Sequence, residues 1–181
     1  MKTSLKSRLK ISVISGLVML IGGLVLLSYM KIRRIISYEE KIKLLPEFEL
    51  TDINGSTIIN HNNILSDRRT LLVFFHTQCD YCTHELTMLN NERHRLFKSN
   101  VILFSEERPE DIHQYMESFN FDECENVFIG RANRQELDGW FGKLVPPTSF
   151  IYDEQLRLVE KHLGSHDIET IIKALEREES Q

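Results

Sequence analysis

Cysteine is scarce in this sequence, and long basic runs, internal repeats and low-complexity segments are missing. Three cysteines in 181 residues are too few for a disulfide-stapled scaffold. The formal net charge is -5 and no basic block lies beyond the N-terminal region, which argues against nucleic acid as a partner. With 41% hydrophobic residues, a chain of this length is expected to fold as one domain around its own core.

Charge is also missing from one long stretch near the N-terminus. Residues 1–10 are basic, whereas residues 11–30 carry no charge. About 20 apolar residues are what a helix needs to cross the hydrocarbon core of a membrane, and a Gly22-Gly23 pair is tolerated there. Residues 11–30 are therefore predicted to form an uncleaved single-span transmembrane helix, followed by a charged linker over residues 31–44.

Two other interpretations of the apolar run are open. A cleaved signal peptide would have a shorter apolar region and a small-x-small cleavage site, and residues 26–31 offer no convincing site. A buried helix of a soluble protein would have polar positions, and this run has only scattered serines. Lys and Arg flank both ends of the run, with a slight bias that favours a cytoplasmic N-terminus and an outward-facing remainder.

Residues 45–178 alternate short apolar runs with helical patterns. Asn54-Gly55 between two apolar segments is a strong signal for a β-hairpin, and this turn also explains the Asn54-Gly55-Ser56 glycosylation sequon without a glycan. Pro109 suits the first position of a helix, and Asn133 with Glu136 matches a capping box. Further strands are predicted within residues 71–75, 101–104, 127–129, 145–153 and 156–161, and helices over residues 79–98, 109–119, 134–141 and 168–175.

This order of elements predicts the fold class. Alternating strands and helices in the middle of the chain imply parallel βαβ units with right-handed crossovers. Two adjacent strands near the end imply an antiparallel hairpin at one edge. The sequence therefore predicts an α/β domain with a central mixed sheet flanked by helices and an N-terminal hairpin.

The most informative stretch is residues 71–86, where an apolar strand leads through three polar residues into Cys79-x-x-Cys82. Cys82, Leu86 and Leu89 then recur at helical spacing, so both cysteines are expected in the first turn of a helix. Unpaired N–H groups and the positive end of the helix dipole favour a thiolate there. Thiol–disulfide exchange needs one attacking thiolate and a second thiol that resolves the mixed disulfide. Cys79 is predicted to attack and Cys82 to resolve.

The spacing disfavours two other roles for these cysteines. A structural zinc site would take four ligands, and His76 and His84, separated by the strand-to-helix context, are poorly placed to complete one. A peroxidatic cysteine would stand in a Thr-x-x-Cys context, and Thr77 is one residue too close to Cys79. Each histidine is more simply explained as a solvated or structural residue, and no metal is expected.

With these residues in place, the sequence resembles the thioredoxin-like superfamily. It looks most like the membrane-tethered thiol–disulfide oxidoreductases of the bacterial TlpA/ResA type, over about residues 45–175. A Cys-x-x-Cys pair followed about 65 residues later by a Pro-Thr segment that opens a strand is a specific combination. The matching segments are Asp52-Ile53-Asn54-Gly55, Cys79-Asp80-Tyr81-Cys82, Glu85 and Pro147-Thr148-Ser149-Phe150.

The resemblance implies further site residues. Pro147 would be a cis-proline packed beside the disulfide, in a loop of Pro146, Pro147 and Thr148 that binds an extended substrate segment. An ordinary rigid turn is the alternative for the two prolines. Glu85, three residues after Cys82, is a candidate for proton transfer, although an exposed or helix-capping glutamate is the simpler interpretation.

The chain also departs from the family. Gln78 stands where a tryptophan usually precedes the first cysteine, and Thr87 where a proline often kinks the helix. Val73 occupies the position at which thioredoxin has a buried aspartate. These differences concern the redox potential and the proton path rather than the exchange chemistry.

The predicted function is a membrane-tethered thiol–disulfide oxidoreductase without a cofactor. The resemblance implies a bacterial inner-membrane protein whose residues 45–178 face the periplasm, with protein thiols and disulfides and a membrane electron donor as partners. A reductive role, in cytochrome c or secreted-protein maturation, is favoured. The alternative is a non-enzymatic tethered module that binds a metal or a partner protein. Cys124 lies among acidic residues that disfavour a thiolate, so it is predicted to be a bystander.

Overall fold

The computed structural model describes residues 2–53, 55, 58–60, 62, 64, 67–121 and 124–177; of residues 2–14 and 34–35 only the backbone is described. The chain divides into two compact units, residues 1–40 and residues 41–181.

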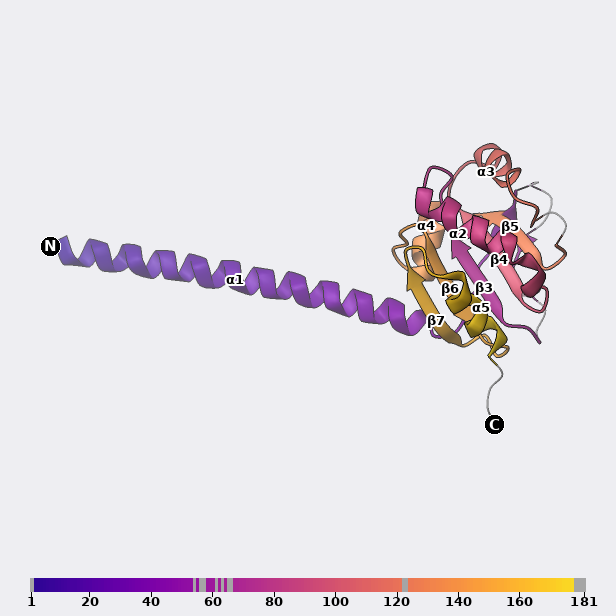
Figure 1. Ribbon diagram of the computed structural model, residues 1–181. Coiled ribbons are helices and arrows are strands. Elements are labelled where there is room, and N and C mark those ends of the chain that lie inside the picture. Colours follow the sequence, from indigo (N-terminus) through magenta and orange to yellow (C-terminus); the bar gives the residue numbers. More distant parts are fainter. Residues whose placement is uncertain are drawn as a thin grey trace. The chain divides into compact units, whose positions relative to one another are not determined.

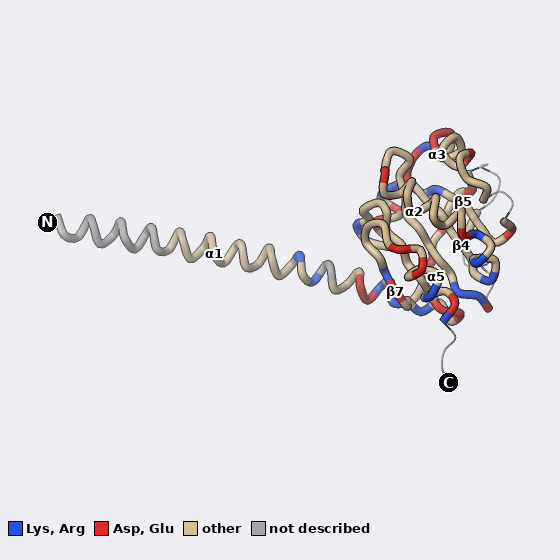
Figure 2. The backbone as a smooth tube through the Cα atoms, in the orientation of Figure 1, with Lys and Arg blue, Asp and Glu red and all other residues tan. Residues whose placement is uncertain are grey.

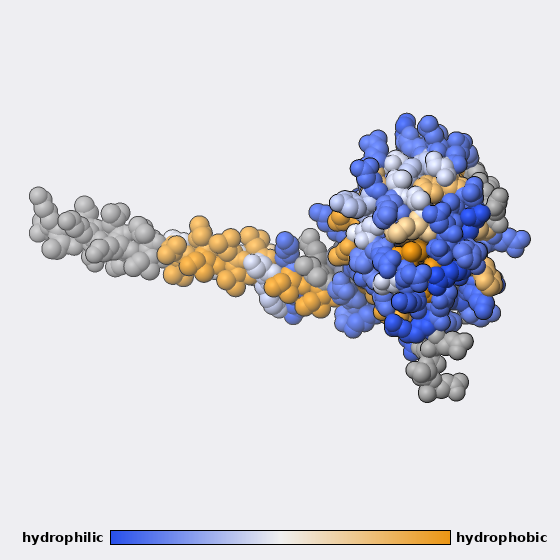
Figure 3. Space-filling model, viewed as in Figure 1, coloured by the Kyte–Doolittle hydropathy of each residue, from blue (hydrophilic) through white to orange (hydrophobic). Residues whose placement is uncertain are grey.

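The first unit is formed by the long helix α1 (Lys2–Lys41). Its stretch Ser15–Lys41 includes an 18-residue window with a mean hydropathy of 1.8 and is long and apolar enough to cross a membrane, the one such helix within the described residues. Figure 3 shows the apolar side chains along this helix, and Figure 2 shows the charged residues that follow them. The segment predicted as a linker is helical as far as Lys41, because it contains good helix formers and neither Gly nor Pro.

The second unit takes in the last residues of the predicted linker. Ile42 and Leu45 are buried in its core, and Leu44 forms an antiparallel bridge with Arg157. The Tyr152 hydroxyl donates a hydrogen bond to the Ile42 carbonyl oxygen at 3.1 Å. The packed core therefore includes residues that lie before Leu45.

A seven-stranded mixed sheet forms the centre of the second unit, in the order β2-β1-β5-β4-β3-β6-β7. Strands β3 to β7 are labelled in Figure 1. The inner strands β3, β4 and β5 run parallel, and the remaining pairs are antiparallel. This arrangement confirms the predicted α/β class with its N-terminal and C-terminal hairpins. The strands are β1 (Leu50–Asp52), β2 (Ile58–Ile59), β3 (Thr70–Phe74), β4 (Asn100–Ser105), β5 (Val127–Arg131), β6 (Thr148–Tyr152) and β7 (Leu158–Leu163).

Helices cover both faces of this sheet, and the apolar side chains of β3 alternate between them. Leu71 and Val73 belong to the core under α2, α3 and α5, whereas Leu72 and Phe74 pack in the core under α4. A central strand buried on both faces explains why its sequence is continuously apolar. The helices are α2 (Asp80–Asn91), α3 (Pro109–Met116), α4 (Arg134–Phe141) and α5 (Ile168–Glu176).

Helix α2 is shorter than its sequence pattern predicts. The apolar spacing continues to Leu96, which is buried, but the α-helix ends at Asn91 and a 3-10 turn (Arg93–Arg95) follows. Asn90 and Asn91 are poor helix formers, because their side chains compete for backbone hydrogen bonds. The prediction of a helix over residues 79–98 relied on apolar spacing and did not take account of these two asparagines.

Local signals at other helix ends are confirmed. Pro109 occupies the first turn of α3, and Asn133 and Glu136 form both hydrogen bonds of a capping box. Gly142 ends α4 at a φ of 76°, which favours glycine. In the hairpin of β1 and β2, the Gly55 N–H donates to the Asp52 carbonyl oxygen at 2.8 Å; Asn54 and Ser56 of the predicted turn and sequon lie outside the described residues.

Candidate functional site

The strand β3 leads into the first turn of α2, and this junction places the two cysteines. Cys79 is the N-cap of α2, with extended backbone angles of φ -112° and ψ 108°. Its Sγ accepts a hydrogen bond from the Cys82 backbone N–H at 3.1 Å. A sulfur at this position therefore receives one of the N–H groups that a helix start leaves unpaired.

Cys79 and Cys82 form a disulfide bond, with their Cα atoms 5.2 Å apart. Cys82 is fully buried against the core under α2, whereas Cys79 is only partly buried. The two sulfurs thus differ in access, and an incoming group reaches Cys79 first.

The peptide bond between Pro146 and Pro147 is cis, as the resemblance predicts. The two prolines lie just before β6, whose first residue, Thr148, pairs with Phe74 at the end of β3. Since Cys79 follows Phe74 by five residues, the sheet brings the proline segment and the cysteine loop to the same edge.

The polar groups of the proline segment are partly used within the fold. The Thr148 hydroxyl is buried and donates to the Val145 carbonyl oxygen at 2.6 Å, so it holds the loop together. The Pro147 carbonyl oxygen accepts from the Gly164 N–H at 2.8 Å. Pro146 remains partly exposed, without an N–H group of its own.

Three large apolar side chains are exposed around these segments. Tyr81, between the two cysteines, is 71% exposed, and Val145, directly before the prolines, is 60% exposed. Leu163 pairs with Thr148 at the end of β7 and is 66% exposed. They come from α2, from the loop before β6 and from β7, so apolar surface flanks the disulfide and the cis-proline alike.

Glu85 is buried, and the interpretation of this residue as exposed or helix-capping is wrong. Its side chain is on the core face of α2, and its carboxylate accepts a hydrogen bond from the Ser149 hydroxyl on β6. Burial raises the pKa of Glu85, and the hydrogen bonds from Ser149 and from the His166 backbone offset part of this effect. Glu85 follows Cys82 by one helical turn, so both groups belong to the buried face of α2.

The two histidines near the cysteines have different surroundings. His84 is exposed on α2, as expected for a solvated residue. His76 is partly buried: its ring meets the Phe74 ring edge-on at 5.3 Å, and its Nε2 atom lies 3.3 Å from the Glu106 carboxylate. His76 is therefore part of an interaction between two loops.

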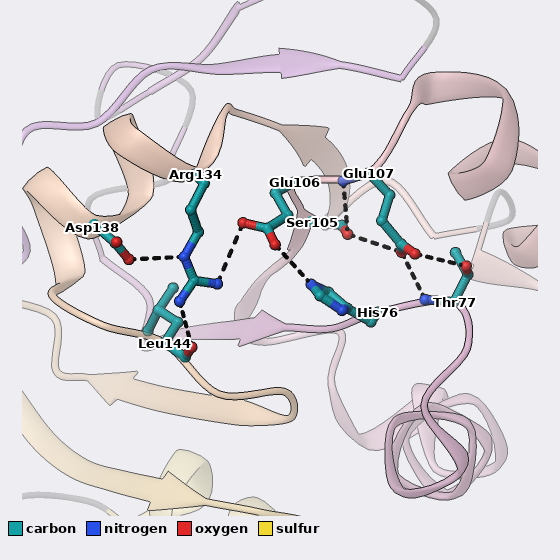
Figure 4. A network of polar contacts seen from close by, with 8 residues as sticks. All are labelled: His76, Thr77, Ser105, Glu106, Glu107, Arg134, Asp138 and Leu144. Atoms are coloured by element: carbon teal, nitrogen blue, oxygen red, sulfur yellow. Dashed lines mark hydrogen bonds and ion pairs between the residues drawn. The ribbon is translucent and has the colours of Figure 1, made fainter.

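A network of polar side chains, missed at the sequence level, surrounds the loop before Cys79 (Figure 4). Glu107 accepts hydrogen bonds from the Thr77 N–H at 2.7 Å and from the Thr77 hydroxyl at 3.0 Å. Glu106 lies between His76 and Arg134. The signal that could have found the acids is their position directly after β4, because parallel strands end at one edge of the sheet.

Cys124 is a free, partly buried cysteine that lies apart from the disulfide. It precedes β5, whereas Cys79 follows β3, and these strands run parallel in one sheet. The two positions are therefore at opposite ends of the sheet. Among the residues that the structure describes, no cluster of three or more His, Cys, Asp or Glu side chains is arranged to hold a metal ion.

Comparisons with known proteins define the fold. No family model and no curated protein sequence matches the chain. Solved structures do match: the exposed lipoprotein thioredoxin Etrx1 of Streptococcus pneumoniae has a TM-score of 0.58 at 17% identity, over 71% of this chain and 97% of that one. StoA from Bacillus subtilis has a TM-score of 0.56 at 18% identity, over 74% and 99%.

A third match is a secreted disulfide oxidoreductase of Mycobacterium tuberculosis, with a TM-score of 0.60 at 11% identity, over 75% of this chain and 96% of that one. The second unit therefore has a thioredoxin-like fold. The second unit contains the Cys79–Cys82 disulfide and the cis bond before Pro147.

Proposed function

We propose that this chain is a thiol–disulfide oxidoreductase, tethered to a membrane by its N-terminal helix, that reduces disulfides of extracytoplasmic proteins. The observation that carries the proposal is the Cys79–Cys82 disulfide at the start of α2, on the same sheet edge as the cis bond before Pro147. Its resemblance in fold to thiol–disulfide oxidoreductases supports this chemistry.

In the reductive direction, both cysteines begin as thiols. The Cys79 thiolate attacks a substrate disulfide, forming a mixed disulfide and releasing one substrate thiolate, which takes up a proton. The Cys82 thiolate then attacks the Cys79 sulfur, which releases the second substrate thiol and leaves the Cys79–Cys82 disulfide. The N–H groups at the start of α2 stabilise the attacking thiolate.

Glu85 is suited to accept the proton that Cys82 must lose. Both groups are buried on one face of α2, one turn apart. Val73, in the same core cluster as Cys82, has no group that could take this role. Because burial raises the pKa of Glu85, its carboxylate is a stronger base than a solvated one. We therefore propose that Glu85 accepts the proton of Cys82, in place of the buried aspartate of thioredoxin.

The proline segment is suited to hold the substrate. The Pro146 carbonyl oxygen can accept a hydrogen bond from a backbone N–H of an extended substrate segment. The segment would then pair with the loop as a short added β-strand. Pro147 would pack beside the disulfide, as the resemblance implies, whereas Thr148 acts by holding the loop. The exposed Tyr81 and Val145 side chains would contact apolar residues of the substrate.

The apolar helix α1 supports a membrane location. We assign residues 11–30 to the bacterial inner membrane and the second unit to the periplasmic side, where a membrane electron donor returns the disulfide to thiols. Etrx1 is described as an exposed lipoprotein and the mycobacterial protein as secreted, which supports an extracytoplasmic setting. We propose cytochrome c or secreted-protein maturation as the process that uses this reductant.

The reduction potential of the Cys79/Cys82 couple tests the direction. A value near that of thioredoxin, about -270 mV, is expected for a reductant, whereas a value near that of DsbA, about -120 mV, would mean an oxidant. A purified chain that carries stoichiometric zinc or copper and exchanges no disulfide would instead support a non-enzymatic metal-binding module.

A further inference from the structure

Two loops lie at the end of the sheet that carries the disulfide. The Glu106 carboxylate lies between His76, in the first loop, and Arg134, which binds the second loop. The first loop, His76 to Gln78, precedes Cys79. The second, residues 144–147, contains the cis-proline bond. One Glu106 oxygen, Oε1, is 3.3 Å from the His76 Nε2 atom, and the other, Oε2, is 3.3 Å from an Arg134 nitrogen (Figure 4).

Arg134 continues this chain of contacts to the proline segment. Its Nη2 atom donates to the Leu144 carbonyl oxygen at 2.8 Å, its Nη1 atom faces Glu106, and its Nε atom lies 3.0 Å from Asp138. Each guanidinium nitrogen thus has a different partner. Lysine lacks this planar fork: its three N–H donors sit on one nitrogen, which cannot reproduce contacts made by three separate nitrogens.

The backbone of Arg134 is also held in place. It is the first residue of α4, directly after Asn133, which forms the capping box. The guanidinium lies 5.9 Å from the centre of the Phe74 ring, on β3. The His76 ring also contacts this ring, so Phe74 supports both ends of the chain of contacts. The side chains of His76, Glu106 and Arg134 therefore have little freedom to rearrange independently.

We propose that His76, Glu106 and Arg134 are positioning residues that hold the proline segment against the Cys79 loop, and so set how well a protein substrate docks. The inference rests on the proposed oxidoreductase function and adds to it a determinant of substrate positioning. The strut, as we name these three residues, touches neither sulfur. Its effect should therefore depend on whether the substrate uses the proline segment.

The exposure of the strut distinguishes positioning from stability. The side chains of His76, Glu106 and Arg134 are 30%, 23% and 36% exposed. Ion pairs that water reaches contribute little to folding stability. Loss of the strut is therefore expected to leave the fold intact while loosening the proline segment, and small displacements of substrate-positioning groups have large effects on rate.

Comparing the rates with a protein disulfide and with a small disulfide tests the proposal. The pre-reduced full chain in detergent micelles is mixed in single turnovers with insulin, a protein disulfide, or with a small aromatic disulfide that needs no docking surface. Arg134→Met and Glu106→Gln are expected to lower the second-order rate with insulin about tenfold, the value of one charge-assisted hydrogen bond. Their rate with the small disulfide should stay within about twofold of the wild type.

Two further variants serve as controls. Arg134→Lys keeps the charge opposite Glu106 and should recover part of the insulin rate, because it loses only some contacts of the guanidinium. Arg108→Met removes an exposed arginine whose ion pair with Asp111 stays within α3 and its N-cap, and it should leave both rates unchanged. Insulin rates that are unchanged in Arg134→Met and Glu106→Gln, or equal losses with both substrates, would overturn the proposal.

A second measurement does not depend on activity. Hydrogen–deuterium exchange of residues 144–149, followed by mass spectrometry of the full chain, should be faster in Arg134→Met and in Glu106→Gln than in Arg108→Met. Unchanged exchange in this segment refutes the strut. A wild-type chain that reduces neither substrate refutes the oxidoreductase function, and the exchange data then still decide whether the two loops are coupled.

Discussion

Ser149 on β6 donates its hydroxyl hydrogen to the carboxylate of Glu85 on α2, and both side chains are buried. The contact joins the strand that follows the cis-proline bond to the helix that carries both cysteines. A carboxylate kept out of water is costly, and one hydroxyl offsets only part of that cost. Glu85 therefore destabilises the folded state. Its place on the helix that carries both cysteines suits the proposed role in proton transfer.

The stability cost of Glu85 is predicted to depend on pH. Burial raises the pKa of Glu85 above its usual value, so the folded state holds a proton that the unfolded state has already lost. Stability therefore falls as pH rises from the unfolded pKa to the folded pKa. Glu85→Gln removes this pH-dependent loss of stability. The variant should therefore melt a few °C above the wild type at pH 8, with a smaller difference at pH 4.

Thermal unfolding of the full chain, followed by circular dichroism at both pH values, checks this expectation. Ser149→Ala is the matched comparison, because it keeps the carboxyl group but removes its hydrogen-bond donor. It should destabilise the chain most at pH 8. A Glu85→Gln variant less stable than the wild type at pH 8 would contradict the argument.

The difference in access between the two sulfurs predicts which cysteine captures a substrate. Cys79 is partly exposed and Cys82 is fully buried. In Cys82→Ala, Cys79 attacks but nothing resolves the mixed disulfide, so disulfide-linked complexes should accumulate on non-reducing gels. Cys79→Ala should trap almost none, and complexes of equal abundance in both variants would contradict the assigned roles.

Cys124 is predicted to be dispensable for exchange. It lies at the opposite end of the parallel strands from Cys79, partly buried in front of β5. Cys124→Ser should leave the exchange rate with a protein disulfide and the Cys79/Cys82 potential unchanged within error. Titration of free thiols in the oxidised chain should give one thiol in the wild type and none in the variant. A shifted potential would give Cys124 a redox role.

The sequence predicted the parts of the site that depend on local patterns. Strand β3, the start of α2 and the greater exposure of Cys79 relative to Cys82 follow from an apolar run, a helical spacing and a chain order that lie within a few residues. The cis bond before Pro147 followed from resemblance. The premature end of α2 was missed because apolar spacing outweighed the local effect of Asn90 and Asn91.

Contacts between distant segments were beyond a single sequence. Glu85 lies one turn after Cys82 under either interpretation, and only the position of β6, which brings Ser149 to it, decides that it is buried. His76, Glu106 and Arg134 come from three separate loops or helix ends, and their meeting depends on how the strands β3, β4 and β5 align. Nothing in the local sequence of any one of them indicates the others.

Gly130 on β5 is predicted to be needed for the packing of the N-terminal hairpin. A Cβ atom at this position would lie 2.8 Å from the Leu50 Cβ atom and 3.0 Å from the Ile59 Cδ1 atom. Both neighbours are buried, and Leu50 is held in β1 between β2 and β5, so the strands must separate to make room. Gly130→Ala should therefore destabilise the chain by about 1–3 kcal/mol.

Gly139→Ala is the matched control for this substitution. Gly139 lies in α4, and a Cβ atom there would meet nothing within 4 Å. Alanine is a better helix former than glycine, so this variant should be more stable by up to about 1 kcal/mol. Urea unfolding of both variants and the wild type, monitored by Trp140 fluorescence, measures the two differences. If Gly130→Ala were as stable as Gly139→Ala, the close packing of β1 against β5 would not constrain the fold.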